Sequence, residues 1–248
     1  PLLEYQELDA SNANFVDKYI FSYYDSYDGD PTSDTIEQFI SDLQVLMKQH
    51  SGIPASIYQQ AALNGALIAF DFQQHLYAPL ICLKAGGLKL TVSPVSLNDD
   101  EKDFVDKLKV YADGNAAVFE DKTLYLLRNK SKVGMGFFEA GNFYPDYVLW
   151  VDAPEKQYIS FIDPKGLLHL QWNDQKIEFY STIKGLERRL QPTCTDKTIV
   201  LNSFIMSATR SADLYQRWGK GMPERRTKHV FCLDEPDCID GMMAMILT

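Results

Sequence analysis

The residues with the clearest chemical potential in this chain lie in two segments, FYPDYVLWV and QYISFIDPKG, which the turn DAPEK separates. Asp146 lies near the start of the first segment, before its apolar run. Asp163 ends the apolar run of the second segment, and Lys165 follows two residues later. Because side chains alternate along an extended segment, Asp163 and Lys165 point the same way. Two carboxylates can bind Mg²⁺, and a neighbouring lysine can orient or deprotonate an attacking water. This set of residue types suits hydrolysis of a phosphodiester.

The turn between the two segments determines how the three side chains meet. A turn centred near residues 154–155 predicts an antiparallel hairpin with Asp146 opposite Asp163 to within about one residue. Charged groups at the end of an apolar face are costly unless they are paired. A structural salt bridge between Lys165 and one of the aspartates satisfies that requirement as well as a metal site does, and spacing alone leaves both interpretations open.

The segments around this hairpin predict an α/β fold, a mixed sheet flanked by helices. Asn98 followed by Glu101 is a capping-box start for a helix that runs to about residue 112. Hydrophobic periodicity then gives the order α-β-β-β-α-β. After the first helix, the expected elements are strands at 123–128, 143–151 and 158–163, a helix at 175–190 and a strand at 198–206. A short apolar helix closes the chain.

The N-terminal part has a different pattern. It predicts helices over 34–49 and 55–75, then strands over 77–83 and 88–95. We therefore expect a helix-rich N-terminal region over 1–95 and an α/β domain over 96–248. The chain begins PLLEYQEL, without Met, a basic segment or an apolar leader, which we interpret as an excised or processed piece without a secretory signal. A missing neighbour would then carry part of the function.

Charge is distributed unevenly along the chain. The net charge is −10, which disfavours a protein that coats nucleic acid. Residues 1–164 carry a net −12, residues 165–230 a net +6 and the last 18 residues a net −4. The basic block can follow a phosphate backbone, although a solvated, salt-bridged face is the alternative. The DNA contacts expected from this block are Lys184, Arg188, Arg189, Arg225 and Arg226.

The cysteines and the sequence motifs limit which kinds of site the protein is expected to contain. The four cysteines form no CxxC pair, so reduced thiols in a cytoplasmic protein are expected. His229, Cys232 and Cys238 could suggest zinc, but no second ligand pair lies nearby. No GxxxxGK[ST] loop occurs, so no bound nucleotide is expected. No apolar run is long enough to span a bilayer.

The motif PD, sixteen intervening residues and DPK resembles that of the PD-(D/E)XK nuclease superfamily, and the element order is similar to its core. Longer stretches, among them LYLLRNKSKVGMGFFEAGNFYPDYVLW and YISFIDPKGL, resemble the C-terminal nuclease region of type III restriction-like DEAD/DEAH-box helicases. The resemblance covers roughly residues 70–248. The middle acid is Asp163, where many relatives have Glu.

The resemblance implies a Mg²⁺-dependent DNA endonuclease, with Mn²⁺ as a substitute metal, in a restriction or phage-defence system. Asp146 and Asp163 would bind the metal and Lys165 would be catalytic. The segment SLNDDEKDF is similar to the helix that supplies a further acid, which makes Glu101 an expected third ligand; the capping box is its alternative role. The implied partners are double-stranded DNA, the helicase or translocase region of the intact chain and a methyltransferase subunit. A catalytically inactive DNA-binding or docking module of the same fold is the alternative function.

Overall fold

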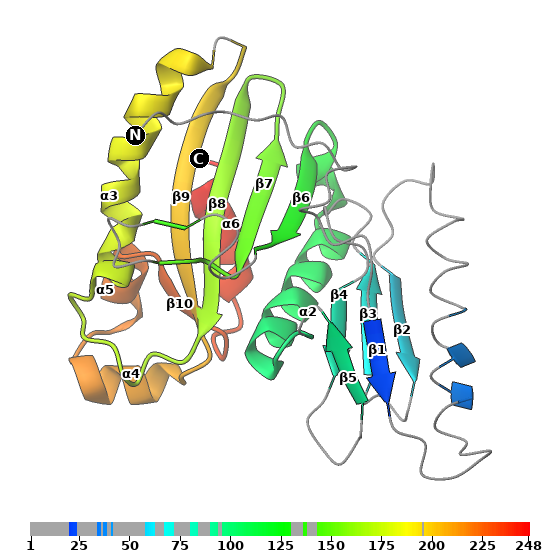
Figure 1. Cartoon of the computed structure of the whole chain (residues 1–248). Coiled ribbons are helices and arrows are strands. Elements are labelled where there is room, and N and C mark those ends of the chain that lie inside the picture. Colours follow the sequence, from blue (N-terminus) through cyan, green and yellow to red (C-terminus); the bar gives the residue numbers. More distant parts are fainter. Residues whose placement is uncertain are drawn as a thin grey trace. The chain divides into compact units, whose positions relative to one another are not determined.

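The computed structural model describes the helices, strands and connections that carry the fold (Figure 1). The described residues are 20–23, 34–35, 37–38, 41, 58–62, 67–71, 80–83, 90–93, 96–129, 136–137, 143–194 and 196–248. They fall into two compact units, Pro1–Leu97 and Asn98–Thr248. The division lies close to the boundary expected at 95–96.

The first unit contains two small antiparallel sheets. β1 (Ile20–Tyr23) pairs with β5 (Leu90–Ser93). β2 (Tyr58–Ala62), β3 (Leu67–Asp71) and β4 (Leu80–Leu83) form a three-stranded meander. The strands expected near 77–83 and 88–95 are thus confirmed.

The helix expected over 55–75 is wrong, because this segment contains β2 and β3. Its apolar character suggested a helix, but Asn64-Gly65 between the two strands is the dipeptide that tight hairpin turns favour. The described residues of the first unit are therefore mainly strands, and the expected helix-rich character of the whole region stays a prediction. The described positions at 34–35, 37–38 and 41 are helical; the rest of the helix expected over 34–49 lies outside the described residues.

The second unit is an α/β domain with one five-stranded mixed sheet in the order β10-β9-β8-β7-β6. The strands β6, β7 and β8 form an antiparallel meander, whereas β9 runs parallel to β8 and β10 runs parallel to β9. The elements are α2 (Asp99–Gly114), β6 (Thr123–Arg128), β7 (Tyr147–Asp152), β8 (Lys156–Lys165), α3 (Gln175–Leu190), β9 (Thr198–Ser207), α4 (Ser211–Trp218), α5 (Met222–Thr227), β10 (Val230–Cys232) and α6 (Cys238–Ile246), with short 3₁₀ turns after α2 and α3.

This order confirms the expected α-β-β-β-α-β series and the C-terminal helix. The sequence pattern did not predict α4, α5 or β10. All three follow the strand β9, in a region where we had expected no further element before the C-terminal helix. Of these three elements, β10 extends the sheet by one strand beside β9.

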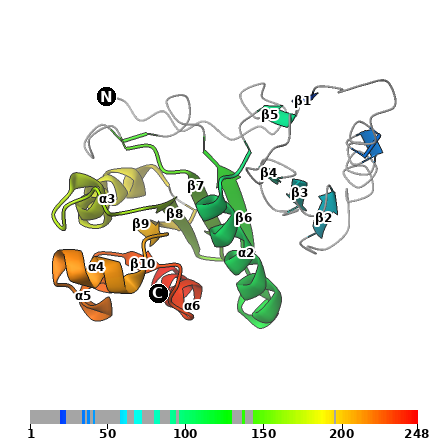
Figure 2. The ribbon, with the colours of Figure 1, turned by 90° about the horizontal axis from the view of Figure 1, so that it is seen from below.

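Helices cover both faces of the sheet, as Figures 1 and 2 show. Phe104 of α2 contacts Tyr147 of β7, with ring centroids 5.5 Å apart. Phe179 of α3 belongs to the opposite face, where Phe137 contacts both Phe179 and Phe161. Register explains the separation, because Tyr147 pairs with Ile162 and Phe161 points the other way.

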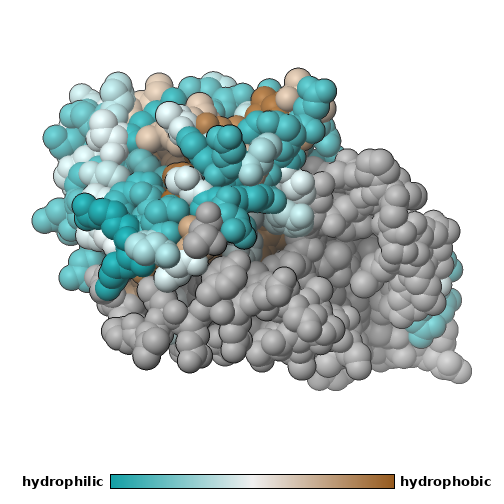
Figure 3. All heavy atoms as spheres, turned by 90° about the horizontal axis from the view of Figure 1, so that it is seen from above, coloured by the Kyte–Doolittle hydropathy of each residue, from teal (hydrophilic) through white to brown (hydrophobic). Residues whose placement is uncertain are grey.

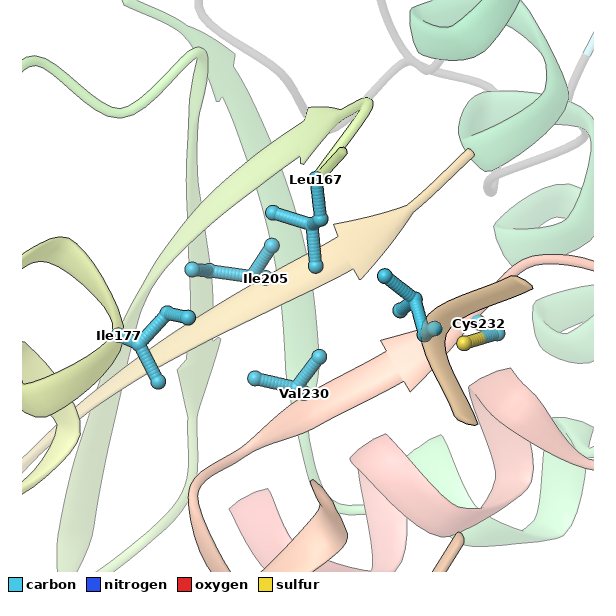
Figure 4. Close-up of a cluster of buried hydrophobic side chains, with 6 residues drawn as sticks. Leu167, Ile177, Ile205, Val230 and Cys232 are labelled. Atoms are coloured by element: carbon cyan, nitrogen blue, oxygen red, sulfur yellow. The ribbon is translucent and has the colours of Figure 1, made fainter. Parts of the chain in front are cut away.

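The core on the α3 side continues to α4 and β10. Figure 4 shows the buried cluster in which Ile177 of α3, Ile205 of β9 and Val230 of β10 meet. Leu167, which follows β8, and Leu214 of α4 complete it together with Cys232. The chain immediately after Lys165 is thus anchored in a hydrophobic core. Among the described residues, no helix is long and apolar enough to cross a membrane.

Candidate active site

The hairpin β7–β8 brings the two aspartates of the motif to the same edge of the sheet. Tyr147 pairs with Ile162 and Asp152 with Gln157, so one step beyond the ladder Asp146 lies opposite Asp163. This register agrees with the one expected from the turn. Asn129 holds the backbone before β7 in place: its N–H donates to the Asp146 carbonyl (2.7 Å) and its side-chain amide donates to the Pro145 carbonyl (2.8 Å).

Asp163 and Lys165 form an ion pair along one side of β8. Asp163 is 5% exposed, and the Lys165 ammonium group donates to its Oδ2. Burial, with the nearby charge of Lys176, lowers the pKa of Lys165 to about 8, and Asp146 opposes this change. The ammonium group also lies 5.1 Å from the centre of the Phe143 ring. Lys165 therefore loses its proton more readily than an ordinary lysine.

Asp146 belongs to the same group of charges. Burial raises the pKa of its carboxyl group above the ordinary value, while Lys165, Arg128 and Lys176 favour the ionised form. These three cations come from the ends of β8 and β6 and from the first turn of α3. Three elements thus place positive charge around one partly buried carboxylate.

Glu101 enters the site from the first turn of α2. It is 5% exposed and completes the expected capping box: its N–H donates to Asn98 Oδ1 (2.8 Å), and its Oε2 accepts from the Asn98 N–H (2.7 Å). Arg128 Nη2 also donates to both carboxylate oxygens, at 3.2 and 3.1 Å. Burial raises the pKa of Glu101, and the charge of Asp146 adds to that effect. The cap is confirmed, and the same carboxylate lies within electrostatic range of Asp146.

The donor set can be compared with what a metal ion needs. Asp146 and Asp163 supply the hard oxygen atoms that Mg²⁺ prefers, and Mg²⁺ commonly takes one or two carboxylates with water and substrate phosphate completing its shell. Within the described part of the chain, no group of three or more His, Cys, Asp or Glu side chains is arranged to hold a metal. The two aspartates therefore fit a site that leaves several positions to water and substrate.

Arg225, one of the expected DNA contacts, is buried and cannot reach DNA. It is 1% exposed, and its guanidinium group donates to Glu235 Oε1 (2.5 Å), Ser211 Oγ (2.6 Å) and Cys232 Sγ (2.7 Å). Burial raises the pKa of Cys232 to about 12, so the thiol is neutral. The expectation for Arg225 is wrong because its charge is neutralised inside the protein by Glu235.

Arg226 and Lys184 are also engaged within the protein. Arg226 forms an ion pair with Asp237 (2.7 Å) and lies 3.4 Å from Glu235. Lys184 donates to the Leu201 carbonyl (2.6 Å) and to Glu187 (2.8 Å). These bonds attach α3 to β9 and α5 to the acidic residues before α6. They match the alternative interpretation of the basic block, a face held by salt bridges.

Arg188 and Arg189 are exposed but lie at the wrong end of the sheet for the site. They occupy the last turn of α3, whose first turn contains Lys176 beside Asp146. A helix rises about 1.5 Å per residue, so roughly 18 Å separates the two ends. Seen from above, the side on which α3 ends, the coloured atoms are mostly hydrophilic (Figure 3). The site edge instead has exposed Arg210 and Arg217, on the turn after β9 and on α4.

From the sequence, Arg128 suggested a turn more than a phosphate contact, and the Thr209 turn was not predicted. Arg128 ends β6 on the face of Leu126 and Leu124, so a charge at the end of an alternating apolar face was the available signal. Thr209 Oγ1 accepts from the Leu167 N–H (2.8 Å), and the Ala208 N–H donates to the Lys165 carbonyl (3.0 Å). No local pattern could have shown those bonds.

Comparison with known proteins adds nothing to this geometry: no family model, curated protein or solved structure matches the chain. The fold and site define an α/β domain with a mixed sheet, at one edge of which two aspartates, a glutamate, a lysine and an arginine converge.

Proposed function

We propose that the second unit is a metal-dependent nuclease domain of the PD-(D/E)XK kind that hydrolyses phosphodiester bonds in DNA. The observation that carries the proposal is the register of the β7–β8 hairpin, which sets Asp146 opposite Asp163 with Lys165 beside them. The α-β-β-β-α-β order supports it, because three elements direct charged groups to one edge of the sheet.

In this proposal, Asp146 and Asp163 hold Mg²⁺ or Mn²⁺, which when bound activates water and neutralises charge on the phosphate. Lys165 takes the proton of the attacking water. Its contact with Asp163 places the amino group beside the proposed metal ligands. Lys176 and Arg128 offset the negative charge of the carboxylates, which reduces the repulsion of a polyanion.

DNA would approach across the edge that carries Arg210 and Arg217 rather than along α3. The exposed loop after Lys165, which includes His169, borders the same edge. The wider proposal is that the domain serves a restriction-type or phage-defence helicase in the intact protein. That part rests on the sequence resemblance alone.

One observation favours a second candidate, a catalytically inactive DNA-binding or docking module. Lys165 is paired with Asp163, and Arg128 is paired with Glu101, so two of the three acids of the site are already paired with protein cations. A domain that had lost its metal would be stabilised by these ion pairs. DNA cleavage by the parent protein distinguishes the nuclease from the inactive module.

The test compares the parent with Asp163→Asn and a matched control, Asp152→Asn. Asp152 ends the same strand pair at its far end and pairs with Lys197 (2.5 Å), so it shares the hairpin but not the site. The parent and Asp152→Asn should nick supercoiled plasmid in Mg²⁺ or Mn²⁺ and bind Mn²⁺. Asp163→Asn should do neither. Cleavage by Asp163→Asn at the parent rate would refute the assignment, and metal-independent DNA binding without cleavage by the parent would favour the second candidate.

A further inference from the structure

The contacts of Glu101 separate its role from that of the two aspartates. Oε2 accepts from the Asn98 N–H at 2.7 Å and from Arg128 Nη2 at 3.1 Å, and Oε1 accepts from Arg128 Nη2 at 3.2 Å. The Glu101 and Arg128 side chains are only 7% and 18% exposed. A carboxylate oxygen accepts about two bonds, so Oε2 is fully occupied.

A metal ion at the remaining position on Oε1 would meet an unfavourable charge. The guanidinium nitrogen lies 3.2 Å from that oxygen, and an arginine in a protein keeps its charge. A divalent ion and a guanidinium group would therefore share one carboxylate oxygen in a poorly solvated place. Asp146 differs, because within the described residues no hydrogen bond reaches its carboxylate.

We infer that Glu101 holds Arg128 in place and does not bind the metal ion, and that Arg128 presents a fixed positive charge to the phosphodiester beside Asp146 and Asp163. The inference rests on the proposed function. Glu101 is then a positioning residue that acts through Arg128. The Arg128 side chain is partly exposed at the end of β6. Its guanidinium group suits a phosphate oxygen better than the ammonium group of a lysine would, because the guanidinium geometry is planar and fixed.

Metal binding tests the first half of the inference. Mn²⁺ affinity of the full chain is measured by calorimetry for the parent, Glu101→Gln and Asp146→Asn. Glu101→Gln keeps an oxygen that can accept from the Asn98 N–H, so the helix cap is preserved. Its Mn²⁺ affinity should stay within about twofold of the parent, whereas Asp146→Asn should lose about tenfold or more.

DNA binding in Ca²⁺, chosen to support binding without cleavage, tests the second half. Arg128→Met should lower DNA affinity by about tenfold, and Arg128→Lys should recover part of the loss. Glu101→Gln should lower it by a smaller factor, since Arg128 remains but loses its ion pair with Glu101. Because both changes act through one group, the double variant Glu101→Gln/Arg128→Met should bind DNA no more weakly than Arg128→Met alone. Unfolding curves of each variant identify those that fail to fold.

The outcomes separate this inference from the proposed function. A parent that binds no Mn²⁺, or an Asp163→Asn variant that binds it normally, overturns both. Loss of Mn²⁺ affinity in Glu101→Gln equal to that in Asp146→Asn overturns the inference alone and makes Glu101 a ligand. Parent-like DNA affinity in folded Arg128→Met, or losses that add in the double variant, removes the role assigned to Arg128.

Discussion

Replacing Glu235 should destabilise the protein more than replacing Arg225, although the two form one ion pair. After Arg225→Met, Glu235 still accepts from Ser211 Oγ (2.9 Å) and lies 3.4 Å from Arg226. After Glu235→Met, the hydrogen bonds that Arg225 keeps among the described residues go to the Ser211 hydroxyl and to the neutral Cys232 thiol. A charge that is 1% exposed would then lack its ion-pair partner.

The magnitude follows from the cost of leaving one member of a buried pair alone, about 3–5 kcal/mol. We expect Glu235→Met to approach that range, and Arg225→Met to cost about 2–3 kcal/mol, because Arg226 compensates part of the remaining charge. The double variant should recover much of the loss, since an apolar pair leaves no buried charge. For a protein of this size 1 kcal/mol corresponds to about 2–4 °C, so Glu235→Met should lower Tm by roughly 10 °C.

Urea unfolding followed by tryptophan fluorescence suits this comparison, because all three tryptophans lie in the second unit. The DNA affinity of each folded variant is measured in parallel. Equal losses of stability for the two single variants would refute the asymmetry. An Arg225→Met variant that unfolds at the same urea concentration as the parent but binds DNA more weakly would show that Arg225 lies at the surface after all.

Three further predictions test other parts of the structure. Lys165→Ala should spare Mn²⁺ binding but slow plasmid cleavage by about 10²–10⁴-fold, and a parent-like rate would remove Lys165 from the mechanism. Replacing Arg210 and Arg217 together with alanine should reduce the slope of log affinity against log salt by about 2, whereas Arg188→Ala should leave it unchanged; the reverse result would move the DNA to α3. Burial lowers the pKa of His229, so the unfolded chain takes up the proton first and stability should fall as pH drops below about 6.5. His229→Asn, which tolerates the positive φ of 57°, should flatten that fall between pH 8 and pH 5 in urea titrations.

Local patterns were sufficient for the centre of the site. The period of two along a strand and the position of the turn determine which residues of a hairpin face each other, so Asp146 and Asp163 could be paired from sequence. The cap at Asn98 is equally local, since its partner Glu101 is three residues away.

Distant partners account for the errors and omissions. Arg225 looked like a surface cation because its neighbours in sequence are charged, yet its environment depends on Glu235 and on β10. Arg128 joins Glu101 across 27 positions. Hydrophobic periodicity carries no information on such pairs, since it reports which face is buried and not which charge meets which.

The position of β8 between an antiparallel and a parallel neighbour has a consequence for folding during synthesis. The β7–β8 hairpin closes between Asp152 and Gln157, and hairpins of this kind form within microseconds. The bond from the Leu167 N–H to Thr209 Oγ1 spans 42 positions and must wait until β9 has left the ribosome. A nascent chain would therefore hold its two aspartates face to face while the segment after Lys165 is still unanchored. Pulse-labelled amide exchange on chains arrested before and after residue 209 should show early protection between Tyr147 and Ile162, and late protection at Leu167 and Ala208.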